Sequence, residues 1–188
     1  MRIRRSLACT LLAIPLTVLT LGQAAYADER TCSGTLGKIT VDNLRVAKGK
    51  FCTLNGTQVK GTIKVEENAS LNAKGVRVVG NVQGEKAKAV NVTATSRVGG
   101  SIQIKQGGAA TISRVVVNGD IQFEENSKAL VATYNTVGGN IQAVKNTGGV
   151  KIANNTVDGN LQCKENQPAP TGSNNVVKGS KEDQCRRL

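Results

Sequence analysis

Val117-Asn118-Gly119-Asp120-Ile121-Gln122-Phe123 is one copy of a short pattern that recurs along most of this 188-residue chain. Its glycine returns every 19 or 20 residues, and a valine stands two positions before each copy. The repeated glycines are Gly61, Gly80, Gly100, Gly119, Gly139, Gly159 and Gly179. A fixed period of about 20 residues with strand-forming side chains is typical of a β-solenoid, in which every repeat forms one coil. The sequence therefore predicts an all-β, single-domain parallel β-helix.

Apolar and polar residues alternate after each glycine. Ile121 and Phe123 fall on one face of the expected strand, and Asp120 and Gln122 on the other. Because the third position after the glycine is glutamine in five repeats, we expect an outward ladder with a spacing of about 4.8 Å. Its members are Gln83, Gln103, Gln122, Gln142 and Gln162. The glycine itself falls on the inward phase, and we expect it to mark a bend without room for a side chain.

Further strands are expected later in each repeat. One begins about ten residues after the glycine, as at 89–92, 110–112 and 150–152, and another leads into the next glycine, as at 115–117. Seven residues after the glycine we expect a turn residue with left-handed backbone. The residues concerned are Asn68, Asn126, Asn146 and Asn166. Two or three strands fit a coil of this length, and seven or eight coils make a rod of roughly 35 Å.

The ends depart from the repeat, as the terminal coils of solenoids do. We expect an irregular first coil over 28–58, regular coils over 59–178 and a C-terminal cap over 179–188. Pro168 and Pro170 interrupt the second strand of the last full coil. Since proline cannot donate to a central ladder, we expect an edge of the sheet there.

Residues 1–27 have the features of a secretory signal peptide. Arg2, Arg4 and Arg5 form a basic region, a largely apolar stretch follows, and residues 25–27 read Ala-Tyr-Ala, a typical cleavage site. The apolar stretch is short for a membrane span. We therefore expect an exported mature chain over 28–188 without a transmembrane span, located in the periplasm or secreted.

Four cysteines remain after the expected cleavage. An even number in an exported chain predicts disulfides. Cys32 and Cys52 lie about one coil apart, as do Cys163 and Cys185. Adjacent coils are separated by about 4.8 Å, which a disulfide can bridge, whereas the other pairings would span several coils. We therefore expect bridges Cys32–Cys52 and Cys163–Cys185 at the two ends; a four-cysteine zinc site is the alternative, although no C-x-x-C pair is present.

The mature chain is basic. Residues 28–188 contain 22 Lys and Arg against 13 Asp and Glu, a net charge of +9. This charge implies affinity for an anionic polysaccharide or another envelope polymer, while its alternative role is to keep the rod soluble and its edges unpaired. Arg77 and Arg97 occupy the same outward phase of successive coils and are candidate anion contacts; Val116 follows them, so the row ends there.

Residue types that support catalysis are sparse. The chain has no histidine, and its aspartates differ in phase, so that Asp120 and Asp158 are not expected to converge. Carbohydrate-cleaving sites need paired acids in one cleft. We expect no catalytic residues, no cofactor and no metal site. The few aromatic residues argue against specific nucleic-acid binding. At the position three residues before each repeated glycine, only Thr136 and Thr156 are threonines. Two threonines are too few for the array of an ice-binding solenoid.

The C-terminal stretch resembles a group of small exported bacterial proteins without a characterised function. The resemblance rests on Gly159-Asn160-Leu161-Gln162-Cys163-Lys164-Glu165-Asn166 and on Lys181-Glu182-Asp183-Gln184-Cys185, and it extends to the signal peptide and the repeats. It implies a periplasmic or secreted β-solenoid. The repeats are also loosely similar to those of bactofilins, polymer-forming β-helical scaffolds that are cytoplasmic and free of disulfides.

Together these observations predict a non-enzymatic exported β-solenoid with a structural or binding role at the cell envelope or outside the cell. Engagement of anionic polymers is its expected form of binding. The alternatives are a small polysaccharide-active enzyme, disfavoured by the scattered acids, and an ice-binding or adhesive surface protein, disfavoured by the missing threonine array.

Overall fold

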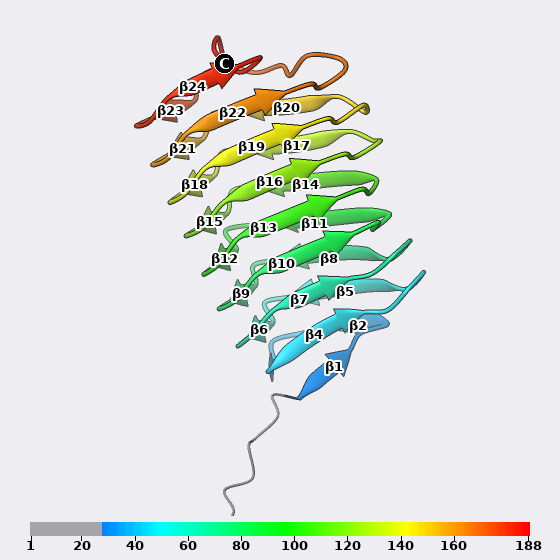
Figure 1. Cartoon of the computed structure of the whole chain (residues 1–188). Coiled ribbons are helices and arrows are strands. Elements are labelled where there is room, and N and C mark those ends of the chain that lie inside the picture. The colour runs from blue at the N-terminus through cyan, green and yellow to red at the C-terminus, as the bar shows by residue number, and fades with distance from the viewer. Residues whose placement is uncertain (1–27) are drawn as a thin grey trace, which may run out of the picture.

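The structure is a computed structural model that describes residues 28–188; the expected signal peptide, residues 1–27, lies outside the described residues. The described chain folds into a rod of eight stacked coils, most of which contribute one strand to each of three parallel sheets (Figure 1). This architecture confirms the predicted single-domain β-solenoid. We name the sheets A, B and C in the order in which the chain enters them.

Sheet A contains the first strand of each coil and faces the viewer in Figure 1. Its nine strands are β1 (Glu29–Thr31), β4 (Asn43–Val46), β7 (Ile63–Val65), β10 (Val82–Glu85), β13 (Ile102–Lys105), β16 (Ile121–Glu124), β19 (Ile141–Val144), β22 (Leu161–Lys164) and β24 (Lys181–Asp183).

Sheet B contains the second strand of each coil. Its seven strands are β2 (Gly34–Leu36), β5 (Phe51–Asn55), β8 (Ser70–Lys74), β11 (Ala89–Thr93), β14 (Ala109–Ser113), β17 (Leu130–Thr133) and β20 (Val150–Ala153).

Sheet C contains the short third strand that leads into the next glycine. Its eight strands are β3 (Thr40–Val41), β6 (Gln58–Val59), β9 (Arg77–Val78), β12 (Arg97–Val98), β15 (Val116–Val117), β18 (Thr136–Val137), β21 (Thr156–Val157) and β23 (Val176–Val177).

The register places equivalent positions of neighbouring coils opposite each other. Ile102 pairs with Ile121, and Gln103 with Gln122. The inward branched residues are fully buried, and all three sheets turn one face to this shared core. Since burying one such side chain stabilises a fold by about 1.5–3 kcal/mol, the stacked rows of Val, Ile and Leu hold the coils together.

The repeated glycines lie at the corner between sheets C and A. The amide of Gly80 donates to the carbonyl of Gly61 at 2.9 Å, and the same bond links each later pair. A Cβ added to Gly80 would stand 2.7 Å from that carbonyl oxygen. The expected lack of room is therefore confirmed, but its cause is the close approach of the preceding coil along the rod rather than the core.

The asparagines expected to adopt left-handed backbone require a correction. Asn68 does so, with φ of 57°, but in three other coils the preceding residue takes this conformation, as Glu125 does with φ of 55°. Asn126, Asn146 and Asn166 are instead buried. The amide nitrogen of Asn126 donates to Asn146 Oδ1 at 3.0 Å and to the carbonyl of Ile104 at 2.9 Å.

This arrangement repeats to form two asparagine ladders. The ladder between sheets A and B consists of Asn126, Asn146, Asn166 and Gln184. The ladder between sheets B and C consists of Asn135, Asn155 and Asn175. In both, from the second member on, each side-chain oxygen accepts from the backbone and side chain of the preceding coil, so buried polar groups are paired along the C-terminal half of the rod.

Both predicted disulfides are present. Cys32–Cys52 joins the first two coils with a Cα–Cα distance of 5.7 Å, and Cys163–Cys185 joins the last full coil to the C-terminal segment at 5.2 Å. The segment expected to be one irregular coil, 28–58, contains strands of two coils, since β1 pairs with β4 and β2 with β5. At the other end, only Thr171 bridges to β20, and sheet B ends beside Pro168 and Pro170 as expected.

Candidate functional site

The two arginines predicted to contact anions lie side by side on sheet C. Arg77 in β9 is the register partner of Arg97 in β12, and both side chains are exposed. Val116 occupies the next rung. A hollow of about 340 Å³ adjoins the pair and is also lined by Val79, Gly99 and Asn118. Neither arginine forms an ion pair within residues 28–188.

Asp120 belongs to a structural ladder rather than to a cleft. It lies one residue after the repeated glycine, where the side-chain oxygen accepts from the backbone amide of the next coil. The other members of this ladder are Asn43, Thr62, Asn81, Ser101, Asn140 and Asn160. Asp120 Oδ1 accepts from both the backbone and the side chain of Asn140. Its carboxylate is therefore engaged in holding two coils in register.

The remaining aspartates of sheet C face lysines. Asp42 pairs with Lys60 at 3.0 Å and Asp158 with Lys178 at 2.8 Å. Asp158 and Asp120 lie two coils apart on different positions of the coil, as the sequence analysis expected. The described residues contain no group of three or more His, Cys, Asp and Glu side chains with the geometry of a metal site.

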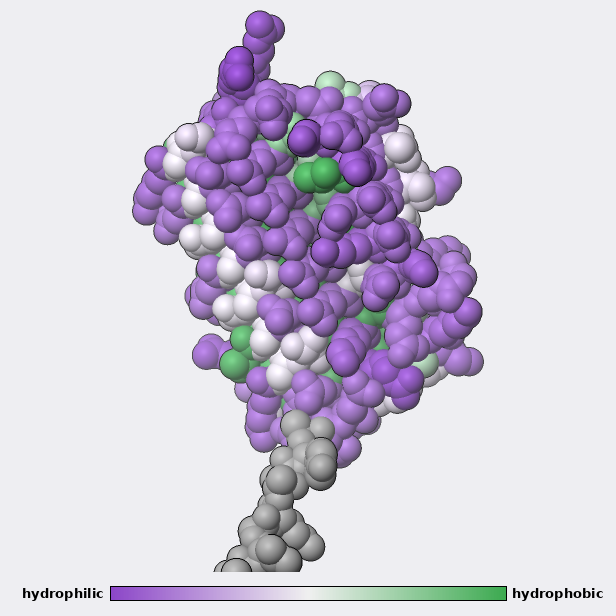
Figure 2. All heavy atoms as spheres, viewed as in Figure 1, coloured by the Kyte–Doolittle hydropathy of each residue, from purple (hydrophilic) through white to green (hydrophobic). Residues whose placement is uncertain are grey.

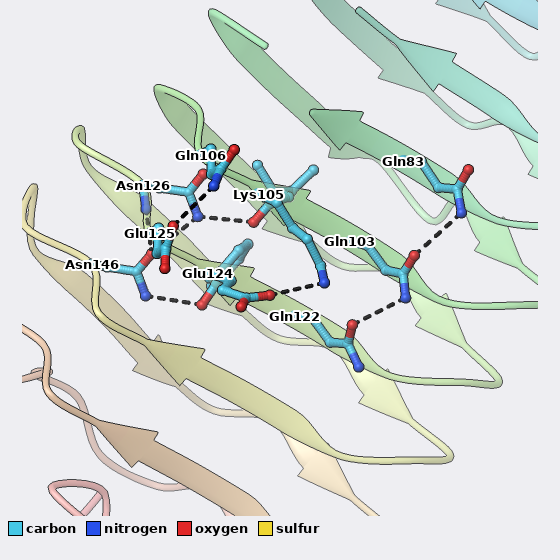
Figure 3. Close-up of polar contacts among 11 residues, drawn as sticks. Gln83, Gln103, Lys105, Gln106, Gln122, Glu124, Glu125, Asn126 and Asn146 are labelled. Atoms are coloured by element: carbon cyan, nitrogen blue, oxygen red, sulfur yellow. Dashed lines mark hydrogen bonds and ion pairs between the residues drawn. The ribbon is translucent and has the colours of Figure 1, made fainter. Parts of the chain in front are cut away.

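A second hollow, of about 500 Å³, lies on sheet A (Figure 3). Along one side runs the predicted glutamine ladder, in which Gln83 donates to Gln103 at 3.3 Å and Gln103 to Gln122 at 3.0 Å. On the other side Lys105 Nζ pairs with Glu124 at 2.8 Å. These glutamines are half-buried rather than fully exposed. The polar groups of this hollow largely bond to one another.

One carboxyl has a displaced pKa. Lys48 Nζ donates to Glu67 Oε2 at 2.7 Å, and this hydrogen bond, with the attraction of the lysine charge, lowers the pKa of Glu67 below its ordinary value. Lys86 adds a smaller contribution in the same direction. Glu67 is exposed, so the pair is a surface feature of the turn between sheets A and B.

The surface carries more cations than its acids can neutralise. Of the 22 basic residues in 28–188, six form ion pairs, namely Arg45, Lys48, Lys60, Lys105, Lys164 and Lys178. The face that carries sheet A is mostly hydrophilic (Figure 2). No helix in the described part of the chain is long and apolar enough to cross a bilayer. The two disulfides are typical of an oxidising compartment.

Sequence reasoning missed two exposed aromatic residues. Phe51, at the start of β5, is 54% exposed, and Tyr134, directly after β17, is 57% exposed. Arg114 lies over the Tyr134 ring, with its guanidinium carbon 5.5 Å from the ring centroid. Both aromatics belong to the sheet B side of the rod. Their positions in the repeat, Phe51 next to the inward Cys52 and Tyr134 at the turn after β17, are the signal that could have placed them on the surface.

Comparisons of the chain with protein-family models, with curated proteins and with solved structures found no match.

Proposed function

We propose that this protein is a non-enzymatic, exported β-solenoid that has a structural or binding role at the cell envelope or outside the cell and engages anionic polymers. The observation that carries the proposal is the unneutralised basic surface, in which Arg77 and Arg97 stack on adjacent coils with no acidic partner among residues 28–188. Paired guanidinium groups bind carboxylates and phosphates, and a surplus of exposed cations attracts polyanions over longer distances.

The roles of the acidic side chains support a non-enzymatic function. Asp120 accepts from the backbone and side chain of Asn140, while Asp42 and Asp158 pair with lysines. Hydrolysis of glycosides requires two carboxyl groups that flank one bond, with one of them kept protonated. Export is supported by the two disulfides and by the basic-apolar character of residues 1–27.

Titration of residues 28–188 against an acidic and a neutral polysaccharide at low and physiological salt tests the proposal. We expect binding to the acidic polymer alone and a steep loss of affinity as salt rises, because the interaction is screened and releases counterions. Arg77→Glu with Arg97→Glu should weaken binding in part, since other cations remain. Equal affinity for the two polymers, or affinity indifferent to salt, would contradict anionic-polymer binding.

A further inference from the structure

The acidic residues within 28–188 lie outside one of the three faces of the rod, the face of sheet B. The sheet B face, which we define as 33–38, 50–56, 70–75, 88–95, 108–114, 128–134, 148–154 and 168–174, contains no Asp or Glu. All 13 acids of the described chain lie outside this face, on the strands of sheet A, at the corner between sheets C and A, or in the turns between sheets A and B. The sheet B face carries seven exposed cations: Lys38, Lys50, Lys74, Lys88, Arg114, Lys128 and Lys151. None of them forms an ion pair within residues 28–188.

Three of these lysines form a regular row along one edge of the face. Lys50, Lys88 and Lys128 come shortly before β5, β11 and β17, which are every second strand of sheet B. Between Lys88 and Lys128 the intervening coil has Gly108, which carries no side chain, and between Lys50 and Lys88 it has the buried Ala69. The lysines therefore repeat every two coils, a distance of about 9.6 Å along the rod.

The strip beside this row is polar but uncharged over four coils. Thr53, Asn72, Asn91 and Thr111 are consecutive register partners in the middle of sheet B, and all are half-buried. Hydroxyl and amide groups both donate and accept hydrogen bonds, which suits a ligand rich in hydroxyls. A hollow of about 200 Å³ lies farther along the face, lined in part by Val131, where Gly148 and Gly149 lack side chains.

Aromatic residues flank the strip at opposite ends. Phe51 and Tyr134 are the two exposed aromatics of the described chain, and both belong to the sheet B face. An aromatic ring offers an apolar surface to the C–H faces of a sugar, and the tyrosine hydroxyl adds a polar contact. Cations, neutral hydrogen-bonding groups and aromatic rings are thus combined on this one side of the rod.

We propose that a linear acidic polysaccharide with a carboxylate on alternate sugars lies along the sheet B face, parallel to the rod axis. One sugar is about as long as one coil is thick, so its carboxylates recur at nearly the spacing of Lys50, Lys88 and Lys128. The neutral strip faces the sugar hydroxyls. This inference rests on the proposed function and moves its principal contact from Arg77 and Arg97 on sheet C to the face of sheet B.

The test compares two variants of equal charge. The face variant is K50Q/K88Q/K128Q, and the matched control is K64Q/K145Q/K181Q, whose lysines lie on or beside sheet A and likewise form no ion pair within residues 28–188. The probe is hyaluronate, which has one carboxylate per disaccharide, with dextran as the neutral polymer. Thermal unfolding of both variants verifies the fold, because exposed substitutions of this kind change stability by no more than about 0.5 kcal/mol.

The face variant should lose about tenfold in affinity for hyaluronate while the control stays within about twofold, since exposed charge contacts contribute modestly and add up. Equal losses, or a loss confined to R77E/R97E, would overturn the sheet B assignment and leave anionic-polymer binding intact. If the wild-type chain does not bind hyaluronate, the sheet B proposal is overturned. If it does not bind a second acidic polymer either, the proposed function is overturned as well. If the protein binds anionic phosphatidylglycerol vesicles or single-stranded DNA more tightly than hyaluronate, the proposal that its ligand is a polysaccharide is overturned.

Discussion

The turns of the N-terminal half of the rod contain small or apolar side chains, whereas those of the C-terminal half contain asparagine ladders. Ala69 and Ala87 are buried at the corner between sheets A and B, where later coils have Asn126 and Asn146. At the corner between sheets B and C, Val115 precedes the ladder that begins at Asn135. The coil length is nearly the same in both halves. Dispersion contacts and paired amides are therefore interchangeable at these corners only when every buried polar group finds a partner.

The largest effect is expected from breaking a ladder at its middle. Asn146→Ala removes the acceptor for the backbone and side-chain nitrogens of Asn126 and the donor to the carbonyl of Phe123. Orphaned buried groups cost about 1–3 kcal/mol each, so we expect a loss near 4 kcal/mol in denaturant unfolding. Val76→Ala, at a buried corner in the other half, should cost about 2 kcal/mol. Equal losses of unfolding free energy in the two variants would show that a ladder residue contributes no more to stability than an apolar corner residue.

Removing the disulfides one at a time compares the two ends. Loops of about 20 residues predict a loss of about 3 kcal/mol for each bridge. Both ends keep their strand pairing, and the C-terminal segment also keeps a rung of the asparagine ladder, because Gln184 accepts from the backbone and side chain of Asn166. We therefore expect hydrogen exchange to increase more over 29–41 in C32S/C52S than over 181–185 in C163S/C185S. Greater exchange at the C-terminal end would contradict a stabilising role for the hydrogen bonds between Gln184 and Asn166.

Extending a ladder by one rung sharpens the same comparison. In Val115→Asn, the new amide faces Asn135 Oδ1, which already accepts from the backbone of residue 115 at 3.0 Å. Val117→Asn buries the same amide in the same coil, on β15 and away from the ladder. Because an unpaired buried amide costs about 1–3 kcal/mol, V115N should be more stable than V117N by about 2 kcal/mol. Thermal unfolding of the two variants measures the difference.

The smallest effect concerns Glu67, in the N-terminal half. Its folded-state pKa is lowered by Lys48, so its stabilising contribution is present above the unfolded pKa of about 4.3 and disappears as the pH falls through the folded value. Lys48→Met should raise the pKa of Glu67 toward its ordinary value. NMR titration of the carboxyl carbon measures the shift, with Lys64→Met as the control that should leave it unchanged.

Much of the fold follows from the spacing of a few residue types. The glycines predicted the coil, and the one-coil separation of Cys32 from Cys52 predicted the disulfides, since both depend on stacking alone. The asparagine ladders were missed because Asn126 and its equivalents suit a left-handed turn as well as a buried rung, and only the neighbouring Glu125 distinguishes the two. The acid-free face is not apparent in the linear sequence, because its residues come from eight separate segments that only the stacking of the coils brings together.

The ladder that contains Asn140 and Asn160 has a consequence for how the length of the rod can change. A second copy of residues 139–158, inserted after Asp158, would place Asn140, Asn146 and Asn155 opposite their own duplicates. Each copy would offer the donors and acceptors that its neighbour requires, and the terminal cysteines would keep their partners. Tandem duplication of one coil is thus a route by which a gene for such a protein can lengthen its product in equal increments without an unstable intermediate.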